Sequence, residues 1–287
     1  MKYRFSKLFI FALAALMLPM FSLAQEGPLE KKDPAPPLTV EDIIQRFAAK
    51  EKQFKEAREN YTYTQDLRVD TLDGDTVDGE FRQVVDITFD AQGRRIEHVV
   101  FAPQNSLQRI SMTREDFADI EKRMPFVLTS DEIPEYDILY VGQQQEDELH
   151  TYVFDVAPKK IEKDKRYFQG RIWVDDHDFQ IVKTHGKNVP DIGTGKKNGQ
   201  ENLFPAFTTW RQQIDGKYWF PTYTLVDDEL HFKTGDVHVK QVVKYTNYKR
   251  FGANVKITYE GQDIKPGQDN PQPTQPAPTT PPPSNPK

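Results

Sequence analysis

The chain has 287 residues and an acidic balance, with 38 Lys and Arg against 44 Asp and Glu and a formal net charge of -6 at pH 7. That balance disfavours nucleic acid as a partner, because the phosphate backbone attracts positive charge. The chain has no cysteine, which excludes disulfides, thiolate metal sites, cysteine nucleophiles and a lipid-modified cysteine. We therefore expect a protein that is not lipid-anchored and that is held together by packing alone.

Residues 1–24 are predicted to be an export signal. Basic residues precede an apolar run over 8–18, and a small-residue cleavage site ends at Ala24. The apolar run is shorter than the roughly 20 residues that a membrane-spanning helix needs. We expect cleavage after Ala24 and a mature protein in the periplasm.

Two further segments are predicted to lie outside the folded domain. Residues 25–38 are charged and rich in proline, and residues 261–287 combine many prolines with almost nothing apolar. Segments of this composition cannot bury enough apolar surface to fold. We expect a disordered linker over 25–38 and a disordered tail over 261–287, which is either an extended spacer or docking peptide or a plain solvated terminus. Residues 39–260 remain as one folded domain.

Helical periodicity occurs in two places. Thr39 and Asp42 have the spacing of a capping box and predict a helix from Thr39 to about Arg58. Its apolar residues recur at helical spacing: Ile43, Ile44, Phe47, Ala48 and Phe54. A second capping-box sequence at Thr113 predicts a shorter helix that ends before Pro125, because proline restricts the residue before it.

Most of the remaining chain between the tails alternates between apolar and polar residues with period two, and Gly, Asp and Asn mark the turns. We count about ten strands on this pattern. Because short turns join successive strands, the sheet is expected to be antiparallel, and strands this long must curl or close to cover their apolar face. The predicted fold class is mainly β (α+β).

The stretch "IWVDDHDFQIVK", residues 172–183, places three aspartates and a histidine between two apolar runs. Short polar side chains favour hairpin turns, so we interpret residues 175–178 as a turn. A calcium or zinc site is the alternative, although no Asp or His spacing elsewhere identifies further ligands. Trp173 is expected to be buried. Residues 70–80, "DTLDGDTVDGE", are predicted to form another hairpin, because the order of an EF-hand fails at Val77.

Aromatic and aliphatic residues on the predicted strands are candidates for the wall of a hydrophobic cavity, with an ordinary β core as the alternative. Trp219 and Tyr223 are predicted to share one side of a strand, and Tyr218 and Phe220 the other. The candidate wall residues are Ile87, Phe89, Tyr152, Phe154, Ile172, Val174, Phe179, Ile181, Trp219 and Tyr223.

One long loop and the histidines are the remaining candidates for a chemical site. The loop 186–205 is far longer than an ordinary hairpin connection, and is either a lid or simply disordered. Within it, "GTGKKNG" at 193–199 lacks the order of a phosphate-binding loop. The six histidines suggest no catalytic arrangement, because triads are recognised by geometry rather than by order. We therefore predict no enzyme activity, no metal and no cofactor.

Two segments carry a resemblance to a known family: "GRIWVDDHDFQIVK" and "FTTWRQQIDGKYWFPTYTLVDD". With the order of elements over residues 39–259, the chain resembles the bacterial outer-membrane lipoprotein-sorting and carrier superfamily (LolA/LolB-like), in particular its uncharacterised exported branch. The resemblance implies an incomplete antiparallel β-barrel with the N-terminal helix and a second short helix against its apolar face. It also implies an apolar cavity, which in characterised relatives holds lipoprotein acyl chains. The chain departs from the carriers in an extra loop at 187–203 and in its Pro-rich tail.

The first functional hypothesis is a periplasmic binding or carrier protein for a lipid or a lipoprotein acyl chain, with transient membrane contact. The alternative is an envelope sensor or protein-interaction domain that uses the same fold to bind another envelope protein. The acidic charge and the Pro-rich tail favour the alternative slightly, whereas the aromatic strands favour the first hypothesis.

Overall fold

The computed structural model describes residues 26–90, 92–191 and 203–251. Within them, none of the helices is long and apolar enough to cross a membrane. The elements follow the chain as α1 (Val40–Arg58), β1 (Tyr61–Asp73), β2 (Thr76–Phe89), β3 (Arg95–Phe101), α2 (Arg114–Lys122), a 3-10 helix (Ile133–Glu135), β4 (Tyr136–Glu146), β5 (Leu149–Pro158), β6 (Tyr167–Asp175), β7 (Ile181–Val189), β8 (Phe207–Ile214), β9 (Tyr218–Phe232) and β10 (Gly235–Arg250).

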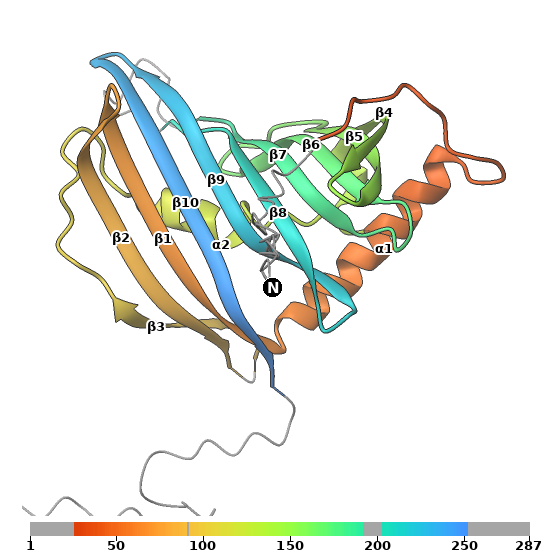
Figure 1. Ribbon diagram of the computed structural model, residues 1–287, viewed down its shortest axis with the longest axis horizontal. Coiled ribbons are helices and arrows are strands. Elements are labelled where there is room, and N and C mark those ends of the chain that lie inside the picture. Colours follow the sequence, from red (N-terminus) through yellow and green to blue (C-terminus); the bar gives the residue numbers. More distant parts are fainter. Residues whose placement is uncertain (1–25, 91, 192–202, 252–287) are drawn as a thin grey trace, which may run out of the picture. The chain divides into compact units, whose positions relative to one another are not determined.

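The strands form one antiparallel sheet in the order β3-β2-β1-β10-β9-β8-β7-β6-β5-β4 (Figure 1). β3 and β4 are its two edges, so the sheet is not closed into a barrel. Register shifts interrupt several of the pairings, including β1–β2, β6–β7 and β8–β9, and such bulges increase twist and bend the strands. The predicted curled antiparallel sheet is confirmed.

Both predicted helices are present, and both begin with a capping box. The side chain of Thr39 accepts a hydrogen bond from the backbone of Asp42, whose carboxylate accepts from the backbone of Thr39. Thr113 and Asp116 make the same pair of hydrogen bonds at the start of α2. These bonds satisfy backbone donors that the first helical turn leaves without partners.

The two helices lie on one face of the sheet, which we call the inner face. Phe47 of α1 packs on Phe154 of β5 with ring centroids 5.6 Å apart, and Phe117 of α2 packs on Phe81 of β2 at 5.8 Å. A smaller apolar cluster of Val153, Trp173 and Val182 lies on the opposite, outer face. Trp173 is buried, as predicted, and its indole nitrogen donates to the side chain of Gln144.

Residues 26–33 differ from the expected linker, because they pair with the edge strand β4. The backbone of Gly27 donates to Gln145 at 2.8 Å, and Glu30 and Gln143 exchange two backbone hydrogen bonds. At Gly142 an added Cβ would lie 2.1 Å from the carbonyl oxygen of Glu30, so only glycine permits this approach. Charged and Pro-rich composition does not prevent such pairing, since it is the main chain that fills the unpaired edge. We call residues 26–33 the N-terminal arm.

The aspartate-rich stretch is a hairpin turn between β6 and β7, as predicted. The carboxylate of Asp175 accepts backbone hydrogen bonds from His177 at 3.1 Å and from Asp178 at 2.8 Å. Residues 70–80 also contain a hairpin, in which Asp73 pairs with Thr76 across a turn at Gly74. Residues 193–199 and most of the predicted lid lie outside the described residues.

Candidate binding cavity on the inner face

The structure separates the ten candidate wall residues into two groups. Trp219 packs with the outer cluster, and Tyr223 lies beside Trp210 with ring centroids 5.8 Å apart. They share one side of β9 opposite Phe220, as predicted, but that side is the outer face, because Phe220 packs on Phe54 of α1. The remaining eight are on the inner side: Ile87, Phe89, Tyr152, Phe154, Ile172, Val174, Phe179 and Ile181.

Most of the inner-side group is packed against α1 and does not surround an open space. Phe154, Ile172, Val174 and Ile181 are completely buried and form one cluster with residues of α1. The ring of Phe179 stacks on Tyr152, and Arg46 of α1 lies 4.8 Å from its centroid. This half of the inner face is therefore a core, and a ligand site must lie elsewhere.

A cavity of about 490 Å³ lies where the C-terminal ends of α1 and α2 leave the inner face uncovered. Two smaller recesses adjoin it, of about 210 Å³ and about 30 Å³, and Glu121 lines all three. Of the sequence-predicted residues, only Phe89 lines the cavity. Its walls combine aromatic and charged side chains: Lys55, Arg58, Glu59, Phe89, Arg95, Glu121, Lys122, Arg123, Phe126, Val127, Glu132, Glu135, Tyr136, Lys165, Arg166, Tyr167 and Phe168.

Aromatic rings form a connected part of the cavity wall. Phe126 stacks on Phe168 with ring centroids 4.3 Å apart and lies 6.1 Å from Tyr136, which in turn contacts Tyr167 at 6.3 Å. Burial raises the pKa of Tyr136 to about 12, so its ring is neutral at physiological pH. These rings offer apolar surface together with hydroxyl groups.

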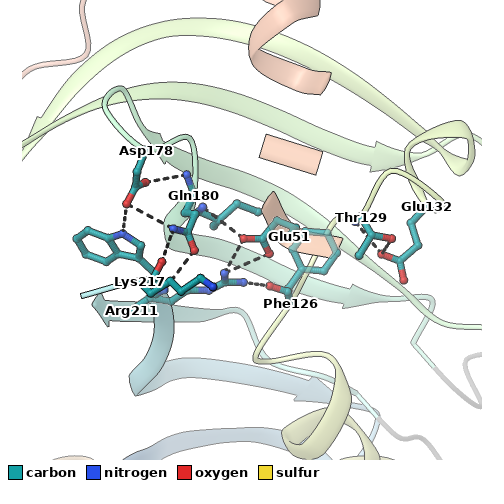
Figure 2. Close-up of polar contacts among 10 residues, drawn as sticks. Glu51, Phe126, Thr129, Glu132, Asp178, Gln180, Arg211 and Lys217 are labelled. Atoms are coloured by element: carbon teal, nitrogen blue, oxygen red, sulfur yellow. Dashed lines mark hydrogen bonds and ion pairs between the residues drawn. The ribbon is translucent and has the colours of Figure 1, made fainter. Parts of the chain in front are cut away.

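A buried ion pair fixes the position of this wall (Figure 2). Arg211 of β8 donates to Glu51 of α1 at 2.9 Å, and both side chains are at most 1% exposed. The other guanidinium nitrogen of Arg211 donates to the carbonyl oxygen of Phe126, and Glu51 also accepts from the backbone of Ile181 at 3.4 Å. Burial raises the pKa of Glu51, while the Arg211 charge opposes that rise. One pair thus holds α1, β7, β8 and the segment after α2 together.

Further contacts hold the segment 126–132 against α1. Lys55 pairs with Glu132 at 3.0 Å, and the backbone of Ser130 donates to Ala48 at 3.2 Å. Glu132 also accepts from the backbone of Thr129 (Figure 2). The cavity wall is therefore a tertiary arrangement, since its parts come from residues 55–59, 89–95, 121–136 and 165–168.

Sequence reasoning missed the charged residues of the cavity. A usable signal was present at Lys165-Arg166-Tyr167-Phe168, where two cations precede two aromatic residues at the start of a strand. Asp119 of α2 accepts from Arg166 at 2.9 Å and from Arg123. Burial raises the pKa of Asp119 and lowers that of Arg166, because a low-dielectric environment disfavours both charged forms.

A larger depression of about 1020 Å³ lies on the outer face, over Gly170 of β6 and Gly186 of β7. Its lining also includes the side chains of Trp173, Lys183 and Trp210. It is more open to solvent than the inner cavity, which makes it the weaker candidate for enclosing a ligand. In the described part of the chain, no three His, Asp or Glu side chains are grouped to hold a metal ion.

Comparisons with known proteins give structural neighbours only. No protein-family model matches the sequence, and no curated protein matches it with significance. The structure is similar to a DUF1329 family protein from Desulfovibrio piger, with 14% identity, 72% of this chain and 92% of that chain covered, and a TM-score of 0.37. It is also similar to a putative outer membrane lipoprotein-sorting protein domain from Vibrio parahaemolyticus, with 12% identity, the same coverage and a TM-score of 0.33.

A third neighbour is MucB in complex with MucA(peri), with 13% identity, 71% of this chain and 93% of that chain covered, and a TM-score of 0.21. The description of the second neighbour, a putative outer membrane lipoprotein-sorting protein domain, names the same kind of protein as the family that the sequence resembles. The low TM-scores make these neighbours no guide to the ligand of this chain.

Proposed function

We propose that the chain is an exported, non-enzymatic protein of the periplasm that binds the apolar part of a lipid or a lipoprotein acyl chain in the inner-face cavity. The supporting observation is the cavity itself, whose volume of about 490 Å³ falls in the range of about 300–1,000 Å³ that is usual for small-ligand sites. Burial of an acyl chain supplies about 0.8 kcal/mol per methylene, from which the cost of ordering the ligand is subtracted.

The direct test is native mass spectrometry with lipid extraction on the full chain, purified from the periplasm of its own cells. Co-purified lipid is the expected result, together with uptake of a fluorescent acyl probe by the emptied protein. Protein that is persistently empty and takes up no probe would refute the proposal.

A matched pair of variants locates the binding site. Val127→Trp places a large ring in the inner cavity and should abolish probe binding, because Val127 is half-buried in its wall. Leu139→Trp adds the same ring on the outer face, where Leu139 is exposed beside the larger depression, and should leave binding unchanged. The reverse pattern would move the site to the outer face.

The second candidate function, a protein-interaction domain, is favoured by the edge strand β3. Its outer edge pairs with none of the described residues, and Ile96, Val99, Val100 and Phe101 are 41–60% exposed. An open apolar edge of this kind can accept an extended segment of another protein. Crosslinking in cells separates the two functions, since a stable protein partner without lipid favours the second, and lipid with only transient partners favours the first.

A further inference from the structure

The cavity carries more positive than negative side chains, although acidic residues outnumber basic ones in the whole chain. Four of its wall residues are carboxylates: Glu59, Glu121, Glu132 and Glu135. Seven are cations: Lys55, Arg58, Arg95, Lys122, Arg123, Lys165 and Arg166. The local charge of the wall is therefore opposite in sign to that of the protein.

Part of this positive charge has a structural explanation. Lys55, Arg58 and Lys122 lie in the last turns of α1 and α2, where cations complement the helix dipole. Arg95 begins β3 and Arg166 directly precedes β6, so neither serves a helix end. Arg95 pairs with Glu97 and Arg166 pairs with Asp119, but these pairs do not use all of the guanidinium donors.

Several of the cations have hydrogen-bonding capacity that the protein leaves unused. Arg58 has no hydrogen bond or ion pair with any described residue, although it is half-buried and lines two of the adjoining spaces. The side chains of Arg166 and Arg95 are only 7% and 11% exposed. Each has a buried Nε without a hydrogen-bond partner among the described residues, and Nη1 of Arg166 is in the same state. Buried guanidinium donors without acceptors are costly, and an oxyanion satisfies them in pairs.

Arg58 also lies next to apolar surface. The smallest recess places it beside Phe54, Phe89 and Tyr248. Arg58 therefore places a positive charge next to apolar surface at the border of the larger cavity.

From these contacts we infer that the ligand of the cavity is an anionic amphiphile, whose phosphate or carboxylate group lies at Arg58 and Arg95 while its apolar part lies along the aromatic wall. This inference rests on the proposed function and narrows its ligand class. Glu121 opposes it locally, because it lines the same spaces and has no ion pair with a described residue. Removal of the Glu121 charge should therefore strengthen the binding of an anionic ligand.

The experiment compares three probes on the full mature chain, below their micelle concentrations: dodecyl phosphate, dodecanol and inorganic phosphate. Dodecyl phosphate should bind about tenfold more tightly than dodecanol at low salt, as expected for hydrogen bonds to a charged group. The preference should shrink as salt is raised, because salt screens partly exposed charges. Inorganic phosphate alone should bind much more weakly.

Four substitutions test the assigned residues. Arg58→Gln and Arg95→Gln should each weaken binding of dodecyl phosphate about three- to tenfold and leave dodecanol unchanged. Glu121→Gln should strengthen binding of dodecyl phosphate, since it removes a like charge. Lys244→Gln, an exposed residue on the outer side of β10, is the control and should change nothing. If Arg95→Gln fails to fold, the half-exposed Arg58 still provides the test.

The outcomes separate the inference from the proposed function. Equal affinity for dodecyl phosphate and dodecanol refutes the inference and leaves acyl binding in place. No binding of either refutes the proposed function. Inorganic phosphate that binds as tightly as dodecyl phosphate would indicate a site for free anions and would refute an amphiphilic ligand. A Glu121→Gln variant that binds dodecyl phosphate more weakly than the parent protein would refute the negative charge assigned to the ligand.

Discussion

Along most of its length α1 fills the inner face beneath β5, β6 and β7, whereas space remains where its C-terminal end and the shorter α2 leave the sheet uncovered. α1 has 19 residues and α2 has 9, which correspond to lengths of roughly 28 Å and 13 Å at 1.5 Å per residue. The long helix reaches across several strands and buries Phe154 and Ile172 completely. The short one ends at Lys122, near the point where Arg95 and Glu121 line open space. One curled sheet thus provides both a core and a cavity.

The largest expected contrast is between two phenylalanines, one in each region. Phe154→Ala removes a completely buried ring from beneath α1 and should lower the free energy of unfolding by about 3–5 kcal/mol. Phe89→Ala shortens a side chain that already borders open space, so it should cost about 1 kcal/mol, which is near the centre of the mutational range. Urea denaturation of both variants measures the difference. Equal costs would mean that the two regions are packed alike.

Substitutions of Glu51 and Arg211 test how much their ion pair contributes to the packing of α1 on the sheet. Glu51→Ala leaves the Arg211 charge buried without its partner and should destabilise the fold by about 3 kcal/mol. The double variant Glu51→Leu with Arg211→Met removes both charges and should recover much of that loss. Denaturation curves for the single and double variants provide the comparison. A loss below about 1 kcal/mol in the single variant would place the pair outside the stabilising core.

The two capping boxes allow the same change in each region. Thr39→Ala and Thr113→Ala each remove a side-chain acceptor from a helix start and should cost about 1 kcal/mol. Hydrogen exchange should locate the first loss in α1 and the second in α2. Both helices border the cavity at their C-terminal ends, but the start of the short α2 lies much nearer that end than the start of α1. Thr113→Ala should therefore change the affinity for an acyl probe more than Thr39→Ala. An effect of Thr39→Ala alone on binding would reverse the assignment of the two regions.

The smallest effect is expected at the β6–β7 turn, which lies away from the cavity. Replacement of Asp176-His177 by Asn-Gly keeps Asp175 and the two backbone N–H groups that donate hydrogen bonds to its carboxylate. The pair Asn-Gly suits a tight hairpin, so the stability should change by less than about 0.5 kcal/mol. Melting temperatures with and without calcium or zinc check the same site. A parent protein stabilised by metal, next to a variant that is not, would identify a metal site in place of a plain turn.

Some features could be predicted because residues close in sequence create them. The capping boxes at Thr39 and Thr113 need only a partner three residues away, and the turn at Asp175 is closed by hydrogen bonds within five residues. Period-two alternation likewise identified the strands and put Trp219 and Tyr223 on one side of β9. In each case the sequence contains the whole interaction.

The tertiary structure alone decided which side of the sheet the helices cover, and with it the place of the cavity. Alternation separates Trp219 and Tyr223 from Phe220, but only the contact between Phe220 and Phe54 shows which side is inner. The N-terminal arm binds an edge that exists only once β4 has joined the sheet. Glu51 and Arg211 meet across 160 positions of sequence, and the charged wall combines four distant segments. The physical reason is shared: these contacts depend on strand register, curl and helix length together, and no short stretch of sequence contains all three.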